Sequence, residues 1–149
     1  SSGCYSRAAV YGNIEEYEYY WVFLTVGSRH QRVSAILDTT NGLVAFPCTD
    51  CVHCGHHRDP PFQPNASTSA SWMPCGPSCA GTCSAGHCHY SQHFLEGSSF
   101  QGRWLTEQIR VGGDERGPHS PFRTRVGCHD SETGLFTTQK ANGFFGLGP

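Results

Sequence analysis

The chain alternates between short apolar runs and polar segments rich in turn-forming residues, with no long stretch at the helical period. Residues 17–26 are dense in aromatic and β-branched side chains and predict a strand. Residues 31–37 predict its antiparallel partner across a turn at 27–30. A short apolar run at 43–46 predicts a third strand that ends at Pro47, because proline cannot donate to a ladder. The N-terminal part of the chain is therefore predicted to be β structure.

The remaining apolar segments predict a long hairpin over residues 90–111, a loop at 112–121, a strand at 122–128 and a turn at 130–134. The last run, residues 142–148, is apolar but interrupted by glycines, which allow neighbouring backbones to approach closely. No helix longer than about two turns and no internal repeat is predicted. We expect a single all-β domain over residues 1–149, with 1–16 as an arm or peripheral strand.

Composition narrows the class of protein. The formal net charge is -2, which leaves no basic footprint for a nucleic acid, and no apolar run approaches the ~18–20 residues that span a bilayer. Eighteen glycines and nine prolines agree with a turn-rich β protein. The chain begins with Ser1 and has no signal-like apolar region, so any targeting segment is expected to have been removed or left out.

Nine cysteines indicate an oxidising compartment unless they bind metal. Cys48, Cys51 and Cys54, followed by His56 and His57, allow a zinc site that cysteines further on would complete. However, the spacing never gives two paired knuckles, and four more cysteines crowd a Gly/Pro/Ser-rich stretch at 75–88. Disulfides are therefore favoured over a metal site, and residues 48–88 are interpreted as a cysteine-rich insertion stapled to the surface.

Two further features concern location and partners. The odd cysteine count leaves one thiol over, and the isolated Cys4 is the natural candidate to pair with another chain. Asn65-Ala66-Ser67 is a glycosylation sequon, although such triplets also arise by chance. Both agree with a protein of the secretory pathway (ER or Golgi) or the extracellular space.

Asp38 is the candidate for chemistry. An apolar run delivers it into a turn of Thr39, Thr40, Asn41 and Gly42. The alternative is a solvated turn aspartate that accepts hydrogen bonds from nearby backbone N–H groups. No serine nucleophile elbow is present, and the adjacent Cys128 and His129 point to opposite faces of a strand. Two facing carboxylates can share acid and base roles in peptide hydrolysis without a cofactor, but this chain carries only one such turn.

Several segments together support a family resemblance. They are the opening strand at 19–27, the acidic turn at 36–41, the cysteines at 48–54 and 75–88, Glu96-Gly97-Ser98 with Gly102, and the segments 126–136 and 143–148. With these residues the chain resembles the N-terminal lobe of pepsin-like aspartic proteases, in the cysteine-rich branch of nepenthesins and plasmepsin V. The resemblance implies the double-psi β-barrel fold of acid proteases, with the C-terminal lobe absent from this chain.

The resemblance also implies roles for individual residues. Asp38 would be the first catalytic aspartate, and the Thr39 hydroxyl would lock its loop to the partner lobe. A flap hairpin would close over an extended peptide bound as an added strand, with substrate-binding residues Phe94, Glu96, Gly97 and Ser98. The family's disulfides imply the pairs Cys48–Cys128, Cys51–Cys54, Cys75–Cys88 and Cys79–Cys83.

The chain departs from the family pattern at three places. Thr40 stands where the family has glycine, Asn41 where it has serine, and Phe94 where it has the flap tyrosine. Two hypotheses follow: half of an active plasmepsin V-like endopeptidase, inactive as this chain alone, or a pseudoprotease that serves as a peptide-binding or assembly module. The substitutions favour the second. A protease-inhibitor-like relative that binds other enzymes is a lesser third possibility.

Overall fold

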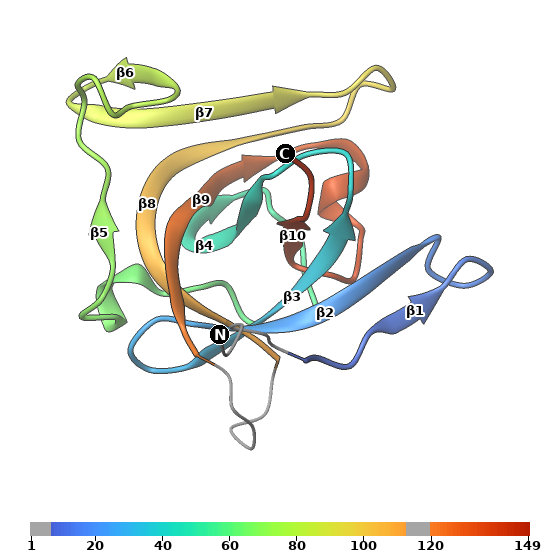
Figure 1. Cartoon of the computed structure of the whole chain (residues 1–149). Coiled ribbons are helices and arrows are strands. Elements are labelled where there is room, and N and C mark those ends of the chain that lie inside the picture. The colour runs from blue at the N-terminus through green and yellow to red at the C-terminus, as the bar shows by residue number, and fades with distance from the viewer. Residues whose placement is uncertain (1–6, 113–119) are drawn as a thin grey trace.

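The structure is a computed structural model of the whole chain, and it describes residues 7–112 and 120–149 (Figure 1). The described residues form strands and two short 3₁₀ turns, as the apolar pattern predicts. The strands are β1 Tyr11–Asn13, β2 Tyr19–Val26, β3 Gln31–Asp38, β4 Val44–Val52, β5 Ser71–Trp72, β6 Thr82–Ser84, β7 His87–His93, β8 Ser99–Val111, β9 Phe122–Glu132 and β10 Gly143–Gly146. The 3₁₀ turns are η1 Pro64–Ala66 and η2 Gly134–Thr137.

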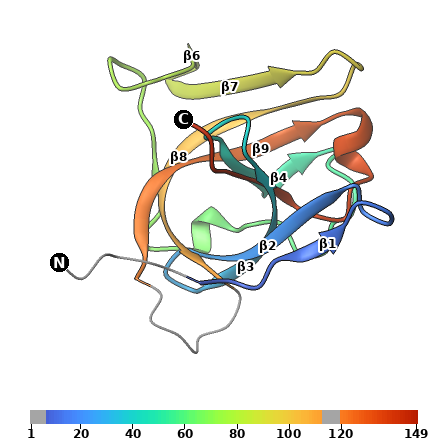
Figure 2. The same cartoon turned by 45° about the vertical axis from the view of Figure 1, so that its right-hand side comes forward.

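One sheet contains these strands in the order β1-β2-β3-β10-β4-β9-β8-β7-β6, with β5 paired to β8. An additional pairing of β2 with β8 brings the two sides together, so that the sheet curls into a barrel (Figures 1 and 2). The inward face of this barrel holds the core, which includes Leu24, Phe46, Leu105, Ile109 and Val126. The β7–β8 hairpin forms a layer above the barrel in both views.

Pro47 lies inside β4, so the prediction that it ends the strand is wrong. β4 pairs with β9 in parallel at Pro47, and the register shifts directly after it. On the other side, the Pro47 carbonyl accepts a hydrogen bond from Phe62 N at 3.0 Å. The missing N–H therefore falls next to an irregularity in the ladder, where proline is tolerated.

The predicted turn at 130–134 is also wrong, because β9 continues to Glu132 and the chain turns only at η2. β8 pairs with β9 from Ile109 to Phe100, and this long partner extends the ladder past the end of the apolar pattern. The loop predicted at 112–121 lies largely outside the described residues.

Glycines let three backbones pass close together around β10. β10 pairs in parallel with β3 and antiparallel with β4. A Cβ on Gly143 would collide with the backbone of Ala45, and one on Gly146 with the backbone of Leu43. The predicted close approach at residues 142–148 is thereby confirmed.

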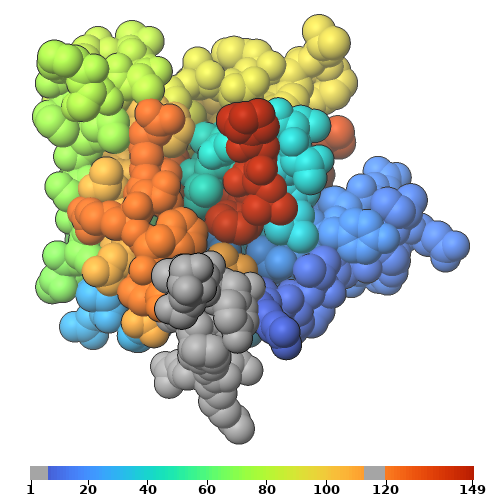
Figure 3. Space-filling model, in the orientation of Figure 1, coloured from blue at the N-terminus to red at the C-terminus, as the bar shows by residue number. Residues whose placement is uncertain are grey.

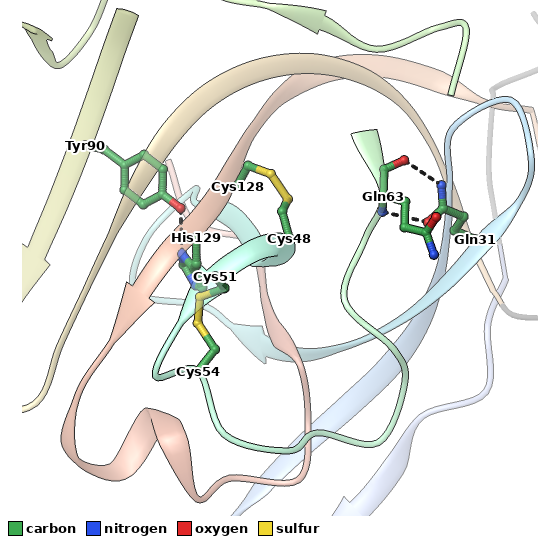
Figure 4. Close-up of a disulfide and its surroundings, with 8 residues drawn as sticks. All are labelled: Gln31, Cys48, Cys51, Cys54, Gln63, Tyr90, Cys128 and His129. Carbon is green, nitrogen blue, oxygen red and sulfur yellow. Dashed lines mark hydrogen bonds between the residues drawn. A yellow bond between two sulfur atoms is a disulfide. The ribbon is translucent and has the colours of Figure 1, made fainter. Parts of the chain in front are cut away.

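Eight cysteines form four disulfides, and Cys4 lies outside the described residues. Cys48–Cys128 joins β4 to β9, and Cys51–Cys54 joins the end of β4 to the loop that follows it (Figure 4). Both are pairs that the family resemblance implies. Near Cys48, the Gln31 side chain exchanges two hydrogen bonds with the Gln63 backbone, which ties the insertion to β3.

The other two disulfides differ from the implied pairs Cys75–Cys88 and Cys79–Cys83. The structure joins Cys75 to Cys83 and Cys79 to Cys88, with Cα–Cα distances of 5.4 and 5.7 Å. The register of the β6–β7 hairpin places Cys83 opposite Cys88, so each of them is stapled to the preceding loop. Four cysteines allow three pairings on sequence grounds. The loop that holds Cys75 and Cys79, with its turn from Gly76 to Cys79, decides which of the two bonds to Cys83 and which to Cys88.

Candidate functional site

Asp38 is the last residue of β3 and is partly buried. Because side chains alternate along a strand, Asp38 shares a sheet face with Ile36. Phe144 and Gly146 of β10 lie beside these two residues in register, whereas Leu37 and Phe145 pack on the barrel core. The carboxylate is therefore on the face of the sheet opposite the core.

Three hydrogen-bond donors hold the Asp38 carboxylate. The Thr40 backbone N–H and the Thr40 hydroxyl donate to Oδ1 at 2.7 and 2.6 Å, and the Asn41 side-chain amide donates to Oδ2 at 2.6 Å. Donors of this kind hold a carboxylate in a fixed orientation. The solvated-turn alternative explains the Thr40 N–H bond, but it does not require the two side-chain donors.

Asn41, which stands where the family has serine, donates to Oδ2 through its side-chain amide. Its own Oδ1 accepts a hydrogen bond from Leu43 N at 2.8 Å, so the amide is held at both ends. At position 40, where the family has glycine, the threonine hydroxyl donates to Oδ1.

The C-terminal segment is hydrogen-bonded to the backbone of the acidic loop, which is the turn at residues 38–42. Leu147 N donates to the Asp38 carbonyl at 2.7 Å, and Gly148 N donates to the Asn41 carbonyl at 2.9 Å. In the space-filling view the C-terminal segment reaches the surface between atoms of the segment coloured cyan, below the yellow hairpin (Figure 3). Thr39 is exposed beside this segment, and its hydroxyl has no hydrogen-bond partner in the described part of the chain.

An aromatic cluster connects the hairpin to the strand beside Asp38. Phe94 stacks at a tilt on Phe100 and Phe136, with ring centroids 5.9 and 5.1 Å apart. Phe100 and Phe136 each lie 5.6 Å from the ring of Phe144, which is two residues before the partner of Asp38 in β10. The tip end of the β7–β8 hairpin and the strand beside Asp38 are thus parts of one packed region.

The hairpin tip is a tight turn built by its own polar residues. Gly97 N donates to the Phe94 carbonyl at 3.0 Å, and Gly97 has the positive φ of 101° that favours glycine. The Glu96 carboxylate accepts from Ser98 N and from the Ser98 hydroxyl, at 3.1 and 2.6 Å. Ser98 Oγ also accepts from Leu135 N, so Ser98 is buried while Phe94 and Glu96 are exposed. That these residues bind a substrate stays a prediction.

Two other predicted features have clear places. Asn65 is exposed in η1, and Ser67 of its sequon is buried and donates to Glu107 at 2.8 Å. No group of three or more histidine, cysteine or acidic side chains that could hold a metal is found among residues 7–112 and 120–149. Within the same residues, no helix has the length and apolar character needed to cross a membrane.

Sequence reasoning missed a buried polar pair beneath the hairpin. The Tyr90 hydroxyl of β7 donates to Nδ1 of His129 on β9 at 2.5 Å (Figure 4). Burial, with the charge of His57 as a smaller cause, lowers the pKa of His129 to about 3. Burial also raises the pKa of Tyr90 well above its usual value. A neutral imidazole therefore accepts from a protonated phenol, and only the placement of Tyr90 opposite β9 could have revealed this pair.

A second buried pair joins His57 to Glu132 at 3.2 Å, with both side chains almost fully buried. His57 Nδ1 lies 2.8 Å from the Gln139 carbonyl and must donate to it. Burial lowers the pKa of His57, but the hydrogen bonds to Glu132 and Gln139 outweigh it and leave that pKa raised. Burial is also the main reason that the pKa of Glu132 is raised.

Known proteins match this chain over most of its length. The family model described as xylanase inhibitor N-terminal matches residues 20–149. Aspartic protease 5 of Toxoplasma gondii is 38% identical over 159 residues, which cover 95% of this chain and 16% of that protein.

Two further relatives also match most of this chain. Plasmepsin V of Plasmodium falciparum is 34% identical over 141 residues, covering 93% of this chain and 24% of that protein. Aspartic proteinase nepenthesin-1 of Nepenthes gracilis is 31% identical over 134 residues, covering 87% and 29%. The chain thus spans less than a third of the length of these relatives. With its all-β fold and its disulfides, this chain belongs to the family of N-terminal lobes of pepsin-like aspartic proteases, in the group that contains plasmepsin V and nepenthesin.

Proposed function

We propose that this chain is the N-terminal half of the catalytic unit of a plasmepsin V-like aspartic endopeptidase, with Asp38 as one of its two catalytic carboxylates. The observation that carries the proposal is the set of donors on Asp38. Thr40 N–H and the Asn41 amide reach different oxygens of the carboxylate, at 2.7 and 2.6 Å. These donors fix the orientation of both oxygens, which a catalytic carboxylate requires.

The chemistry needs a second carboxylate, which a C-terminal lobe would supply. When two carboxylates share one proton, one of them activates water while the other protonates or polarises the peptide carbonyl. The exposed Thr39 hydroxyl, free of partners among the described residues, is available to bond to that lobe. This chain alone is therefore expected to be inactive.

The β7–β8 hairpin would close over the substrate. An extended peptide can add main-chain hydrogen bonds to such a hairpin, and the exposed Phe94 and Leu95 would cover its side chains. Location in the secretory pathway or outside the cell, a glycan on Asn65 and a partner for Cys4 are part of the same proposal. The four disulfides support an oxidising compartment.

The test is peptide cleavage by the full-length protein at mildly acidic pH, with Asp38→Ala. The variant should lose at least about a thousandfold in kcat, the scale on which catalytic groups act. Asp50→Asn, which changes an exposed acid on β4, is the matched control and should retain activity. Cleavage that survives Asp38→Ala would remove Asp38 from the mechanism. Absence of cleavage in the unchanged protein would favour the pseudoprotease, a peptide-binding or assembly module.

A further inference from the structure

A surface pocket away from the acidic loop is lined by histidine, arginine and lysine residues, of which His57 has a buried side chain. It lies between the loop after β4 and the segment after η2, and its lining residues are His56, His57, Arg58 and Lys140. No acidic side chain lines it. In a chain with a formal net charge of -2, such a one-sided lining calls for an explanation.

Backbone hydrogen bonds bring the two cationic segments together. Arg58 N donates to the Lys140 carbonyl at 2.7 Å, and His57 Nδ1 donates to the Gln139 carbonyl at 2.8 Å. The Cys51–Cys54 disulfide closes the loop that leads into His56. The backbones at Arg58 and Lys140 therefore lie side by side, and both residues line the same pocket.

Aromatic rings, and not carboxylates, support these two cations. The Arg58 guanidinium lies 4.3 Å from the centroid of the Trp21 ring, and the Lys140 ammonium lies 5.8 Å from that of Tyr17. Within the described residues, neither cation has a carboxylate partner within 4 Å, whereas Arg32 pairs with Asp59 at 2.8 Å. Cation–π contacts hold a side chain in place without neutralising its charge.

The buried acid Glu132 does not neutralise the pocket either. Glu132 lies behind His57 and is already paired with its Nε2. The turn between β1 and β2 carries Glu15, Glu16 and Glu18, but none of them forms an ion pair with Arg58 or Lys140. Two like charges that line one pocket repel each other, and an anion bound there would offset that repulsion.

We propose that this pocket binds a tetrahedral oxyanion of the phosphate type, free or as a monoester. The Arg58 guanidinium presents a planar set of N–H donors that suits such a group, and Lys140 adds a second full charge. A phosphate group carries about 1.5 to 2 negative charges at neutral pH, so it offsets more of the charge of the two cations than a carboxylate does. His56 is exposed at the rim and adds a further donor. This inference does not depend on the proposed protease activity.

The test is calorimetric titration of the full-length protein with inorganic phosphate and with O-phosphoserine, using acetate as the carboxylate control. Arg58→Gln and Lys140→Gln should each weaken phosphate binding about tenfold or more, because each removes a charge-assisted hydrogen bond. Arg125→Gln is the matched control. Arg125 also stacks on a tryptophan, 4.7 Å from the ring centroid of Trp104, but it lies on β9 and not in the pocket.

The two ligands distinguish the sources of the oxyanion. Tighter binding of O-phosphoserine assigns the pocket to a phosphomonoester, and tighter binding of inorganic phosphate assigns it to the free ion. Either result supports the proposal if Arg125→Gln binds like the unchanged protein. Equal binding of acetate, an equal loss in Arg125→Gln, or no loss in both pocket variants would overturn it. Peptide cleavage is not measured, so failure here leaves the proposed function untouched.

Discussion

At the scale of the residue, the two residues at positions 40 and 41 supply the hydrogen-bond donors to the Asp38 carboxylate. Asn41 replaces a serine, yet its amide donates to Oδ2 at 2.6 Å. Thr40 replaces a glycine, and its hydroxyl adds a bond to Oδ1 that a glycine could not make. The first substitution preserves a donor, whereas the second occupies an oxygen that a catalytic water or shared proton would need.

Thr40→Gly in the full-length protein is expected to raise kcat about tenfold, because it removes a ground-state hydrogen bond of roughly 1.4 kcal/mol from Oδ1 while keeping the backbone N–H. Thr40→Val keeps the branched side chain without its hydroxyl, and peptide cleavage by the two variants is compared. A gain in both identifies the hydroxyl as the cause, and a gain in glycine alone identifies crowding. Unchanged activity in Thr40→Gly would count against both accounts.

His129→Gln is expected to flatten the acid dependence of stability. The folded pKa of His129 is about 3, below the ordinary value of 6.5, so its contribution to stability is complete above pH 6.5 and is lost as pH falls toward 3. Over that window the free energy of unfolding should fall by about 1.4 kcal/mol per pH unit from this residue. Glutamine is a neutral side chain that does not titrate.

Urea unfolding at several pH values between about 7 and about 4 measures how the free energy of unfolding depends on pH. His93→Gln, at an exposed histidine of β7, is the control and should keep the slope of the unchanged protein. His57 acts in the opposite direction, because its raised pKa gives stability that is present below pH 6.5 and lost as pH rises through the folded value. An equal slope in His129→Gln and the unchanged protein would show that His129 is not buried and neutral.

At the scale of the element, the insertion is organised by the register of one small hairpin. β6 and β7 set Cys83 opposite Cys88, and the loop before them supplies Cys75 and Cys79. Each strand of the hairpin is thereby crosslinked separately to the loop. The two disulfides therefore hold β6 and β7, which form the edge of the sheet beyond β8, against that loop.

Cys88→Ser is expected to free Cys79, because the two are joined in the structure. The free thiol can be alkylated without reduction and located by mass spectrometry of the peptides. Cys83→Ser should free Cys75 in the same way. Alkylation of Cys75 in Cys88→Ser would instead restore the pairing that the family resemblance implies.

At the scale of the whole molecule, one face of the barrel carries the acidic loop, the C-terminal segment and the overlying hairpin (Figures 1 and 3). Leu147 and Thr39 are exposed on this face, although the backbone around them is firmly hydrogen-bonded. The basic pocket lies elsewhere, where the loop after β4 meets the segment after η2. The proposed peptide cleavage and the proposed oxyanion binding thus lie in separate parts of the lobe and can be tested separately.

The sequence by itself determined the β class, most strands, the aspartate at the end of β3 and the glycines that let β10 pass between its neighbours. These features depend on alternation, side-chain shape and backbone freedom, which act over a few residues. Only the tertiary structure decided the disulfide pairs in the insertion, the place of Pro47 within β4, the two side-chain donors on Asp38 and the buried histidines. Each of these depends on the register or packing of segments, or on which way a side chain points, and local pattern carries little information about that.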